Sequence, residues 1–443
     1  MSARKSFRPL AVMVVGAVLN VCASGLAHPQ QKIKSAQHPR AIALIHALVI
    51  PSPASDAIAD ATIVIRDGKV VSIRQSGSIP PGSECIDCTG DTVLAGFWNS
   101  HVHFTEPIWQ DAATAPAERV EAGLTKMFTR FGFTHVFDTG SDIKVSAALR
   151  KRVANGEVTG PEIRTAGAII YPRNGAAKML NASEHRDVAG APLRTPTQPE
   201  LDLSLYEAET PEQAKRLVAN RLNSGSDAIK LYLQAWWDPA IQLPAPVIAA
   251  AIAAAHKEHK LVLAHPSNSY GLQSAAALGV DVLLHTTPQT EPWSTTLIEQ
   301  LKHNGTSITP TLKLWRFELT RAGAPAEVVD AFQEAGVQQL RAWHRAGGSI
   351  LFGTDVGYMP EADPAEEYRL MQKAGMGFRD ILRSLTTEPA RKYTGNAANG
   401  AIQTGKKADI TVIQGNPNKD GADLNRVALV IAGGNVVYQS ARK

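Results

Sequence analysis

The sequence is poor in cysteine, in aromatic residues and in charge. It holds 3 cysteines in 443 residues, with 6% aromatic and 19% charged residues against 44% hydrophobic residues. This balance is typical of a folded globular protein and excludes a disordered chain. Beyond residue 27 only Cys85 and Cys88 are left, too few for a disulfide framework. Their spacing directs the side chains to opposite faces of an extended segment, so we expect two separate packed thiols.

An excess of one charge and long apolar runs are absent as well. The formal net charge is +4, which gives no basic surplus for holding nucleic acid, and we expect no nucleic-acid partner. Beyond the N-terminal segment, no apolar run reaches the roughly 20 residues that a membrane-spanning helix requires. We therefore expect that the mature protein is not embedded in a membrane.

The N-terminus has the pattern of a secretory signal. Three basic residues occur among the first eight, an apolar stretch covers residues 9–21, and small residues lead up to Ala27. This predicts a signal peptide over residues 1–27, cleaved after Ala27 or Ala23, and an exported protein, periplasmic or secreted. A membrane anchor is disfavoured because the stretch is short. Lipid attachment at Cys22 is disfavoured because the preceding residue is a valine.

Three regions follow along the chain. Residues 41–94 alternate short β-rich runs with turns, and residues 396–443 return to short strands. Between them, residues 95–395 alternate strand-like runs with helical patterns. Strands that alternate with helices predict an α/β fold with a parallel sheet, here a (β/α)8 TIM barrel.

Local signals mark individual elements of these regions. Asp67-Gly68 between two alternating runs predicts a β-hairpin. Helical patterns cover Thr210–Ser224 and Ala245–His259. Residues 171–205, rich in proline, arginine and asparagine, predict a long loop or lid after the third barrel strand.

One strand-like run carries a histidine pair. His101 and His103 lie two positions apart in the run of residues 92–104. On a strand these positions face the same side, so both imidazoles can reach one metal ion. Imidazole suits zinc and its divalent neighbours, and the pair supplies half of a tetrahedral shell. Alone the pair is a weak signal, because two histidines on one strand face are common.

Four further residues of metal-ligand or basic type lie in or at the end of apolar runs. They are Lys230, His265, His285 and Asp355. Such residues at the C-terminal ends of successive strands, with helical segments between them, describe the catalytic face of a (β/α)8 barrel. Each residue singly is better explained as a packed core side chain or as the cap of the next helix. All six together favour a metal site.

In chain order, the set His-x-His, Lys, His, His, Asp resembles the metal-dependent hydrolases of the amidohydrolase superfamily. The likeness is greatest to its imidazolonepropionase-like and Xaa-Pro-dipeptidase-like members, a group that includes ochratoxin-cleaving amide hydrolases. It extends over nearly the whole chain beyond the signal segment. The flanking segments 132–140, 160–167, 385–391 and 405–413 resemble the family as well. In one departure, Asn99 stands where the family usually has an aspartate.

The resemblance implies a binuclear centre of two divalent ions, by default Zn²⁺. The implied ligands are His101, His103 and Asp355 for one ion, and His265 and His285 for the other. Lys230, N6-carboxylated by CO2, would bridge the ions, and a metal-bridging hydroxide would attack the amide carbonyl. Asp355 would take the proton of that water and pass it to the leaving nitrogen. If Lys230 is instead an unmodified lysine at a strand end, a mononuclear site remains.

The resemblance further implies cleavage of an amide bond in a small-molecule substrate, an N-acyl amino acid or a dipeptide-like compound, with ochratoxin-type amides in the same class. Tyr232 shares the inward face of its strand with Lys230. In peptidase-like relatives the matching tyrosine helps to hold a substrate carboxylate, and a barrel-core aromatic is the alternative. The family also implies a homo-oligomer and a small β-sandwich built from residues 41–94 and 396–443.

Two other readings of the site compete with amide cleavage. A mononuclear cyclic-amide hydrolase or a deaminase could occupy the same fold. Deaminases of this superfamily tend to carry a glutamate soon after the fifth-strand histidine, whereas His265 is followed by Pro-Ser-Asn. This sequence disfavours deamination. A relative without catalytic activity is disfavoured because all six positions are filled.

Overall fold

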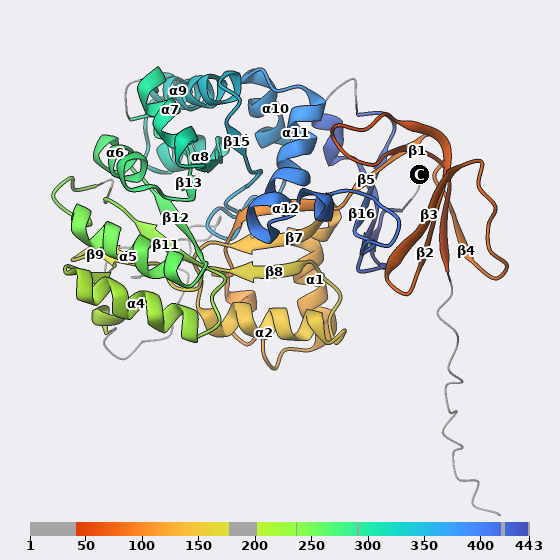
Figure 1. Cartoon of the computed structure of the whole chain (residues 1–443), viewed down its shortest axis with the longest axis horizontal. Coiled ribbons are helices and arrows are strands. Elements are labelled where there is room, and N and C mark those ends of the chain that lie inside the picture. Colours follow the sequence, from red (N-terminus) through yellow and green to blue (C-terminus); the bar gives the residue numbers. More distant parts are fainter. Residues whose placement is uncertain (1–40, 177–201, 236, 290–291, 418–420, 442–443) are drawn as a thin grey trace, which may run out of the picture. The chain divides into compact units, whose positions relative to one another are not determined.

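The computed structural model describes residues 41–176, 202–235, 237–289, 292–417 and 421–441 (Figure 1). The signal peptide predicted over residues 1–27 lies outside the described residues, as does most of the loop predicted over 171–205. Among the helices of the described part, none combines the length and the apolar character that crossing a membrane requires.

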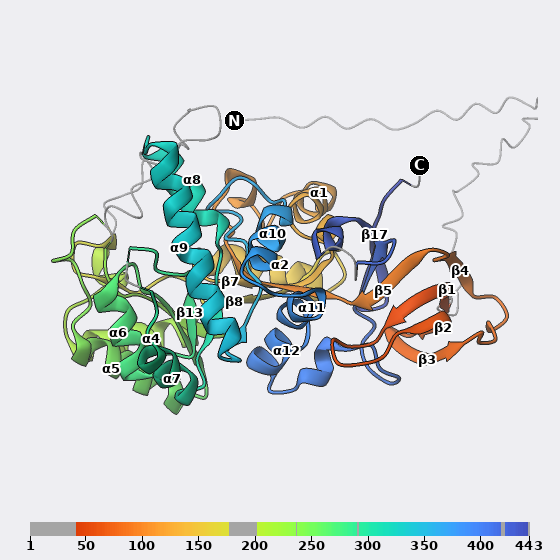
Figure 2. The same cartoon turned by 90° about the horizontal axis from the view of Figure 1, so that it is seen from above.

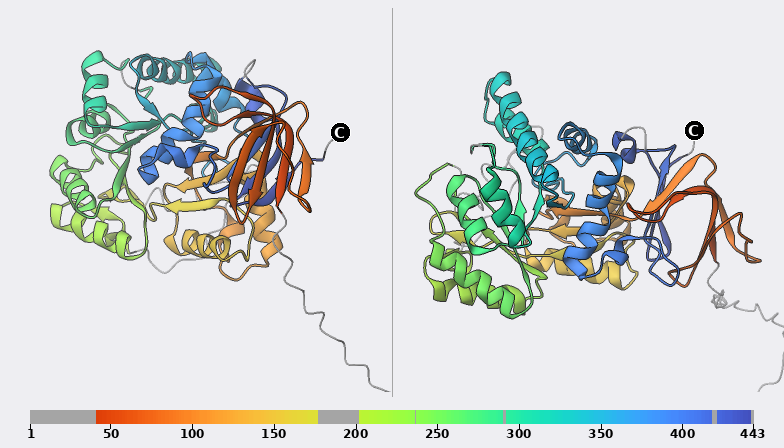
Figure 3. Two further views of the ribbon diagram at one scale, coloured as in Figure 1. Left: turned by 45° about the vertical axis from the view of Figure 1, so that its right-hand side comes forward. Right: turned by 45° about the horizontal axis from the view of Figure 1, so that its top comes forward.

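Both ends of the described chain contribute to one eight-stranded sheet. Its strands are β1 (Ile42–Ile50), β2 (Ile58–Arg66), β3 (Lys69–Gln75), β4 (Glu84–Asp87), β5 (Asp91–Ala95), β16 (Ile410–Gln414), β17 (Val427–Ala432) and β18 (Asn435–Gln439). β5 pairs with β1 in parallel and with β16 in antiparallel orientation, so the order is β18-β17-β16-β5-β1-β2-β3, with β4 beside β1. Figure 3 shows the red-to-orange and blue strands together. The two-layer sandwich stays a prediction.

Neighbouring side chains of this sheet enter two different cores. Val93 on β5 and Val412 on β16 are buried in a core made by the terminal segments of the described chain. The next residues, Leu94 and Ile413, are buried in the large core shared with the helices. Successive side chains of a strand point to opposite faces. One face of β5 and β16 therefore packs against the central region of the molecule.

The hairpin predicted at Asp67-Gly68 is confirmed. It joins β2 to β3, which pair in antiparallel orientation. The backbone φ angles are 52° at Asp67 and 74° at Gly68. A two-residue turn of type I′ requires positive φ at both positions, which aspartate tolerates and glycine adopts without strain.

The central region holds two parallel sheets. One contains β6 (Phe97–Val102), β7 (Phe133–Asp138) and β8 (Glu162–Thr165), and the other contains β11 (Ala228–Tyr232), β12 (Leu261–His265), β13 (Val282–Leu284), β14 (Ser307–Thr309) and β15 (Ser349–Ile350). The short strands β9 (Tyr171–Pro172) and β10 (Glu207–Ala208) pair separately.

Backbone hydrogen bonds join these two sheets at both edges. Beyond β8, Ile170 N donates to Lys230 O at 2.9 Å. At the other edge, Ser100 N of β6 donates to Phe352 O at 2.7 Å, beyond the end of β15. The residues that follow β8 therefore reach β11, and those that follow β15 return to β6.

Helices alternate with the central strands. They are α1 (Ala117–Met127), α2 (Ile143–Ala154), α4 (Pro211–Asn223), α5 (Ala245–Lys257), α6 (Ser269–Leu278), α7 (Thr295–His303), α8 (Lys313–Arg321), α9 (Ala326–Arg345), α10 (Ala365–Lys373), α11 (Phe378–Leu385) and α12 (Thr387–Thr394). The 3-10 helices are η1 (Pro107–Trp109), η2 (Thr129–Phe131), η4 (Leu203–Leu205), η5 (Ala397–Gly400) and η6 (Gly421–Asn425). Figure 2 shows α9 along its length. The described chain is thus an α/β protein.

The two helices predicted from periodicity are confirmed as α4 and α5. Thr210 caps α4 through the amide of Gln213, and the Gln213 side chain returns a bond to the Thr210 amide. This capping box fixes the start of the helix. On α5, Val247, Ala251 and Ala255 are buried. Their spacing of four places them on one stripe, which packs into the large core.

Candidate metal centre

The six predicted residues lie at the C-terminal ends of the central strands. His101 is in β6 and His103 directly follows it, Lys230 is in β11, His265 ends β12, His285 directly follows β13, and Asp355 lies beyond β15. His265 is partly buried and the other five are buried. In parallel strands that are neighbours in a sheet, these ends lie on the same side. The fold therefore collects residues from five strands.

His101, His103 and Asp355 form a close group. Asp355 Oδ1 lies 3.3 Å from His101 Nε2 and 3.1 Å from His103 Nε2, and the three ligand atoms are within 4.8 Å of one another. Oδ1 is buried and receives no hydrogen bond from the described residues. A buried carboxylate oxygen requires a partner. Ligands about 2.0–2.2 Å from a tetrahedral zinc lie roughly 3.4 Å apart, so the three side chains fit a divalent ion.

Two further imidazoles adjoin this group. The ring centroid of His285 lies 4.7 Å from that of His101 and 4.5 Å from that of His265. The cluster therefore continues from the His101 group through His285 to His265. Neither His265 nor His285 is part of the closest set of ligand atoms. All four imidazoles predicted from the sequence are brought together.

Lys230 is buried beside these groups. Its exposed fraction is 2%, and its side chain has no hydrogen bond or ion pair with any described residue. Burial lowers the pKa of Lys230 to about 7, while the carboxylate of Asp355 acts in the opposite direction. An unpaired ammonium group is costly to bury, and this position would favour a neutral or modified amine.

Burial also dominates the histidine pKa values. Burial, followed by the charges of neighbouring groups, lowers the pKa of His101, His265 and His285 well below the ordinary value. Burial acts in the same direction on His103, but the Asp355 carboxylate, the charge of Asp138 and the carbonyl of Gly140 together outweigh it, so the pKa of His103 is raised. Three of the four imidazoles therefore favour the neutral form, which is the form that binds metal ions.

Two of the residues have unusual backbone conformations. The φ angles of His285 and Asp355 are 69° and 61°, in the left-handed region that non-glycine residues rarely adopt. Such a conformation costs on the order of 1–3 kcal/mol and is frequent at functional sites. The amide of Asp355 donates to His101 O and that of His285 to Thr309 O, each at 2.8 Å. These bonds hold both residues in the strained conformation.

A buried aspartate that sequence reasoning missed organises the loop beside His103. Four groups donate to the oxygens of Asp138 at 2.6–3.1 Å: the Gly140 amide and the hydroxyls of Ser141, Ser146 and Thr165. The carbonyl of Gly140 in turn lies 2.8 Å from His103 Nδ1. Donation by Nδ1–H leaves Nε2 of His103 free to face Asp355. The only sequence signal for Asp138 is its position at the end of β7.

Asn99 connects the first histidine strand to the strand of Asp355. Its Nδ2 donates to the hydroxyl of Thr354 at 2.8 Å, and its Oδ1 accepts from the Thr354 amide at 3.1 Å. Asn99 is fully buried. It therefore fixes the relative position of β6 and the segment before Asp355.

Comparisons with known proteins agree with this geometry. The family model of the amidohydrolase family matches residues 92–437, which include all six positions. The chain belongs to the amidohydrolase family. As a member it is a hydrolase that acts on carbon–nitrogen bonds, and the family is metal-dependent.

Solved structures of other amidohydrolases are similar over most of their length. A Xaa-Pro dipeptidase with methionine bound in its active site is 25% identical, with a TM-score of 0.73, over 90% of this chain and 100% of that chain. A candidate prolidase from Bifidobacterium longum is 25% identical, with a TM-score of 0.72, over 92% and 97%. Ochratoxinase from A. niger is 19% identical, with a TM-score of 0.70, over 90% and 96%, which supports the fold alone.

Aromatic side chains adjoin one side of the centre in this amidohydrolase. The ring of Tyr232 stacks on that of His265, with centroids 4.5 Å apart and planes 19° apart. The ring of Tyr171 lies 5.5 Å from that of Tyr232. Both tyrosines are 3% exposed. Tyr232 thus contacts a predicted metal ligand, as expected of a residue on the inward face of β11.

Gly357 allows the segment after Asp355 to approach β6. Its φ is 96°, and a Cβ there would lie 1.9 Å from the carbonyl oxygen of His103. Gly357→Ala should lower the free energy of unfolding by at least about 3 kcal/mol and weaken metal binding, because the added methyl separates His103 from Asp355.

Gly375 provides the matched control. Its φ is 92° and a Cβ would meet nothing within 4 Å, so Gly375→Ala adds only backbone strain, about 1–2 kcal/mol. Denaturant unfolding and metal analysis compare the two variants. Equal losses of stability, with metal binding retained in both, would contradict the close approach at Gly357.

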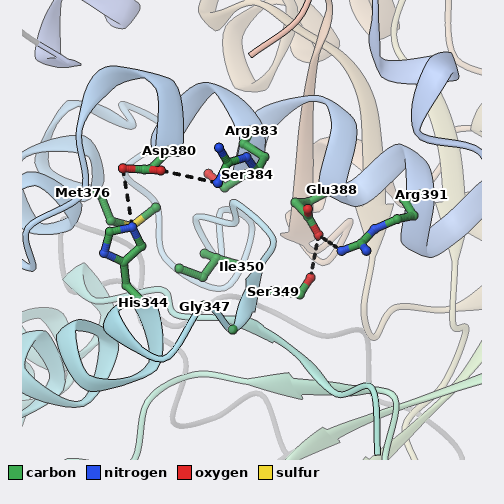
Figure 4. A pocket seen from close by; sticks show the side chains of 11 residues that line it. His344, Gly347, Ser349, Ile350, Met376, Asp380, Arg383, Ser384, Glu388 and Arg391 are labelled. Carbon is green, nitrogen blue, oxygen red and sulfur yellow. Dashed lines mark hydrogen bonds and ion pairs between the residues drawn. The ribbon is translucent and has the colours of Figure 1, made fainter. Parts of the chain in front are cut away.

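A pocket of this amidohydrolase lies at the start of β15 (Figure 4). Its charged side chains are paired with one another: His344 lies 3.4 Å from Asp380, and Arg391 pairs with Glu388. Asp355 follows the opposite end of the same strand. This pocket is therefore separate from the candidate metal centre.

Proposed function

We propose that this amidohydrolase uses two divalent metal ions to cleave an amide bond of an N-acyl amino acid or a dipeptide-like substrate. The observation that carries the proposal is the convergence of four imidazoles, a carboxylate and a lysine at the ends of five strands. Imidazole and carboxylate are ligands of zinc and related ions. A separate deaminase function has no specific support among the described residues.

The proposal includes a closed (β/α)8 barrel as the scaffold of this centre. Eight parallel strands are available, and hydrogen bonds join the two central sheets at both edges through Ile170 and Ser100. In barrels of this type the active site lies at the C-terminal ends of the strands. The six residues lie at those ends.

The close spacing of Asp355 to two imidazoles supports assignment of His101, His103 and Asp355 to one ion. We assign His265 and His285 to the second ion, because their rings adjoin the first group through His101. Lys230 is buried without a partner among the described residues. Addition of CO2 to the neutral amine of Lys230, with release of one proton, would give a carbamate with two oxygens and a negative charge, which could bridge both ions.

Asp355 and Tyr232 would have different roles in the proposed hydrolysis. Divalent ions held at the candidate metal centre would supply a Lewis acid that polarises the scissile carbonyl and lowers the pKa of water. Asp355 directs Oδ1 toward the imidazoles, which leaves Oδ2 to accept a proton from the attacking water and return it to the leaving nitrogen. Tyr232, which contacts His265, would donate a hydrogen bond from its hydroxyl to the substrate carboxylate.

Two relatives support a substrate of this class. They are a Xaa-Pro dipeptidase and a candidate prolidase, each 25% identical over at least 90% of this chain. We further propose export of the protein, on the basis of the basic and apolar N-terminal pattern. An exported hydrolase of this type would act on amides outside the cytoplasm.

The experiment combines a substrate screen with metal removal. Incubation with dipeptides and N-acyl amino acids should release a free amino acid, quantified by chromatography. Chelation should abolish the release and lower the melting temperature, since an ion at 100 times its Kd contributes about 2.7 kcal/mol of stability. Added zinc should restore both. Release of ammonia in place of an amino acid, or full activity after chelation, would contradict the proposal.

A mononuclear hydrolase of cyclic amides is the second candidate. It is favoured by one observation: the closest set of ligand atoms contains only His101, His103 and Asp355. In that case one zinc per chain would support full activity. Two zinc ions per active chain exclude this alternative.

A further inference from the structure

Thr311 has an unusual conformation close to the metal centre. It lies between β14 and α8, is fully buried, and has a φ of 43°. Positive φ is rare for a β-branched residue, because its side chain collides with its own backbone in this region. Such a conformation persists only where surrounding contacts fix it, and it is frequent at functional sites.

The hydroxyl of Thr311 contacts a predicted metal ligand. Thr311 Oγ1 lies 2.5 Å from Nδ1 of His285, whose own backbone is in the left-handed region. If the hydroxyl accepts a hydrogen bond from Nδ1–H, then Nε2 of His285 carries no proton and can bind a cation. In that arrangement the hydroxyl of Thr311 fixes the Nδ1–H tautomer of the imidazole.

A glutamate from another helix holds the backbone next to Thr311. Glu367 on α10 is fully buried. Its Oε1 accepts from the amide of Leu312 at 2.8 Å and its Oε2 from the amide of Lys313 at 3.0 Å. These are amides at the start of α8, which have no partner inside the helix. The residue at the N-cap is a leucine, whose side chain makes no capping bond, so the carboxylate of Glu367 takes that role.

A second contact reinforces the same junction. Lys313 Nζ donates to the carbonyls of Glu361 and Asp363, each at 3.0 Å. Both carbonyls belong to the segment between Asp355 and α10. The start of α8, which follows Thr311, is therefore bound to the segment that follows Asp355.

We propose that Glu367 is a positioning residue for the metal centre. By holding the first amides of α8, it keeps Thr311 in its left-handed conformation with the hydroxyl on Nδ1 of His285. Nε2 of His285 then remains free to bind a cation. This rests on the proposed function in one respect, that the centre binds divalent ions.

Three variants test the proposal, with one control. Glu367→Gln keeps one oxygen that can accept a hydrogen bond. Its side-chain NH2 replaces the other oxygen and faces a backbone N–H group of α8, so one of the two hydrogen bonds is lost. Thr311→Val keeps the shape of the side chain and removes the hydroxyl, and Thr311→Ser restores it. The control is Glu366→Gln on the same helix, since Glu366 pairs with Arg316 at 3.3 Å and its side chain is 43% exposed.

The first measurement is zinc affinity, by competition with a chelator. Glu367→Gln and Thr311→Val should weaken zinc binding by about 10- to 100-fold, as loss of a partner that orients a ligand does. Thr311→Ser and Glu366→Gln should keep the affinity of the unmodified chain. If Glu367→Gln does not fold, Thr311→Val and Thr311→Ser decide the role of the hydroxyl.

The second measurement is the tautomer of His285 in the metal-free protein, from the nitrogen chemical shifts of labelled histidine. The unmodified chain and Glu366→Gln should show the Nδ1–H form, and Thr311→Val a mixture of both forms. The proposal is overturned if Glu367→Gln and Thr311→Val fold and retain both the tautomer and the zinc affinity. An unmodified chain that binds no zinc would defeat the proposed function instead, and the tautomer would still test the positioning.

Discussion

Replacing Lys230 with alanine should remove one of the two zinc ions of the proposed centre and lower kcat/KM for amide hydrolysis by at least about 10³-fold. The reason is that the proposed carboxylated Lys230 would bridge the two ions, whereas Asp355, the carboxylate at the centre, is already assigned to one of them. The cavity left by a lysine side chain can admit a small carboxylate. Acetate or formate should therefore restore part of the metal content and of the activity.

Lys392→Ala is the control for this variant. Lys392 lies on α12 and donates to the carbonyl of Gly305 at 3.0 Å, away from the six predicted ligands. Its loss should leave zinc content unchanged. Metal analysis by mass spectrometry and steady-state kinetics compare the two variants. Unchanged zinc content in Lys230→Ala would defeat the two-metal version of the account, and failure of every small acid to restore activity would count against the bridge.

Replacing Asp355 with asparagine should separate activity from stability. Hydrolysis should fall by about 10³-fold or more, because the variant loses both a metal ligand and a proton acceptor. In the metal-free protein, however, the melting temperature should not fall. Asp355 Oδ1 is a buried acceptor without a well-aligned hydrogen bond from the described residues, and such a group destabilises a fold by about 1–3 kcal/mol. This cost offsets the attraction of the carboxylate to His103. The amide of asparagine can instead donate to an imidazole.

Asp281→Asn is the matched control. Asp281 lies at the other end of β13 and accepts a hydrogen bond from the Val262 amide at 2.7 Å. This variant should lose some stability, since its carboxylate is paired, and keep its metal and activity. Calorimetry of the metal-free proteins and metal analysis distinguish the two. A metal-free Asp355→Asn protein that is markedly less stable than the unmodified chain would show that Asp355 has a structural role in place of a catalytic one.

The six positions that the structure brings together could be predicted because each has a local signal. His265 ends an apolar run and His285 directly follows one, and runs that alternate with helices form parallel strands whose ends meet. Asp138, Thr311 and Glu367 could not be predicted in their roles. Each acts through contacts with residues distant in sequence, and a buried glutamate on a helix resembles any other glutamate in the one-dimensional pattern.

In the fold, too, local elements could be predicted from the sequence and long-range pairing could not. The Asp67-Gly68 hairpin and the helix capped by Thr210 depend on neighbouring residues, so the sequence predicts them. The pairing of β5 with β16 joins the two ends of the described chain. It is selected by the burial of alternating side chains in two cores, which no local pattern specifies.

Anomalous diffraction at the zinc absorption edge, from crystals of the zinc-loaded protein, would locate the ions of the proposed two-metal centre. We expect two peaks, one bound by His101, His103 and Asp355 and the other by His265 and His285, with density for a carboxylated Lys230 between them. A single peak beside an unmodified Lys230, or zinc bound elsewhere on the chain, would contradict this proposal.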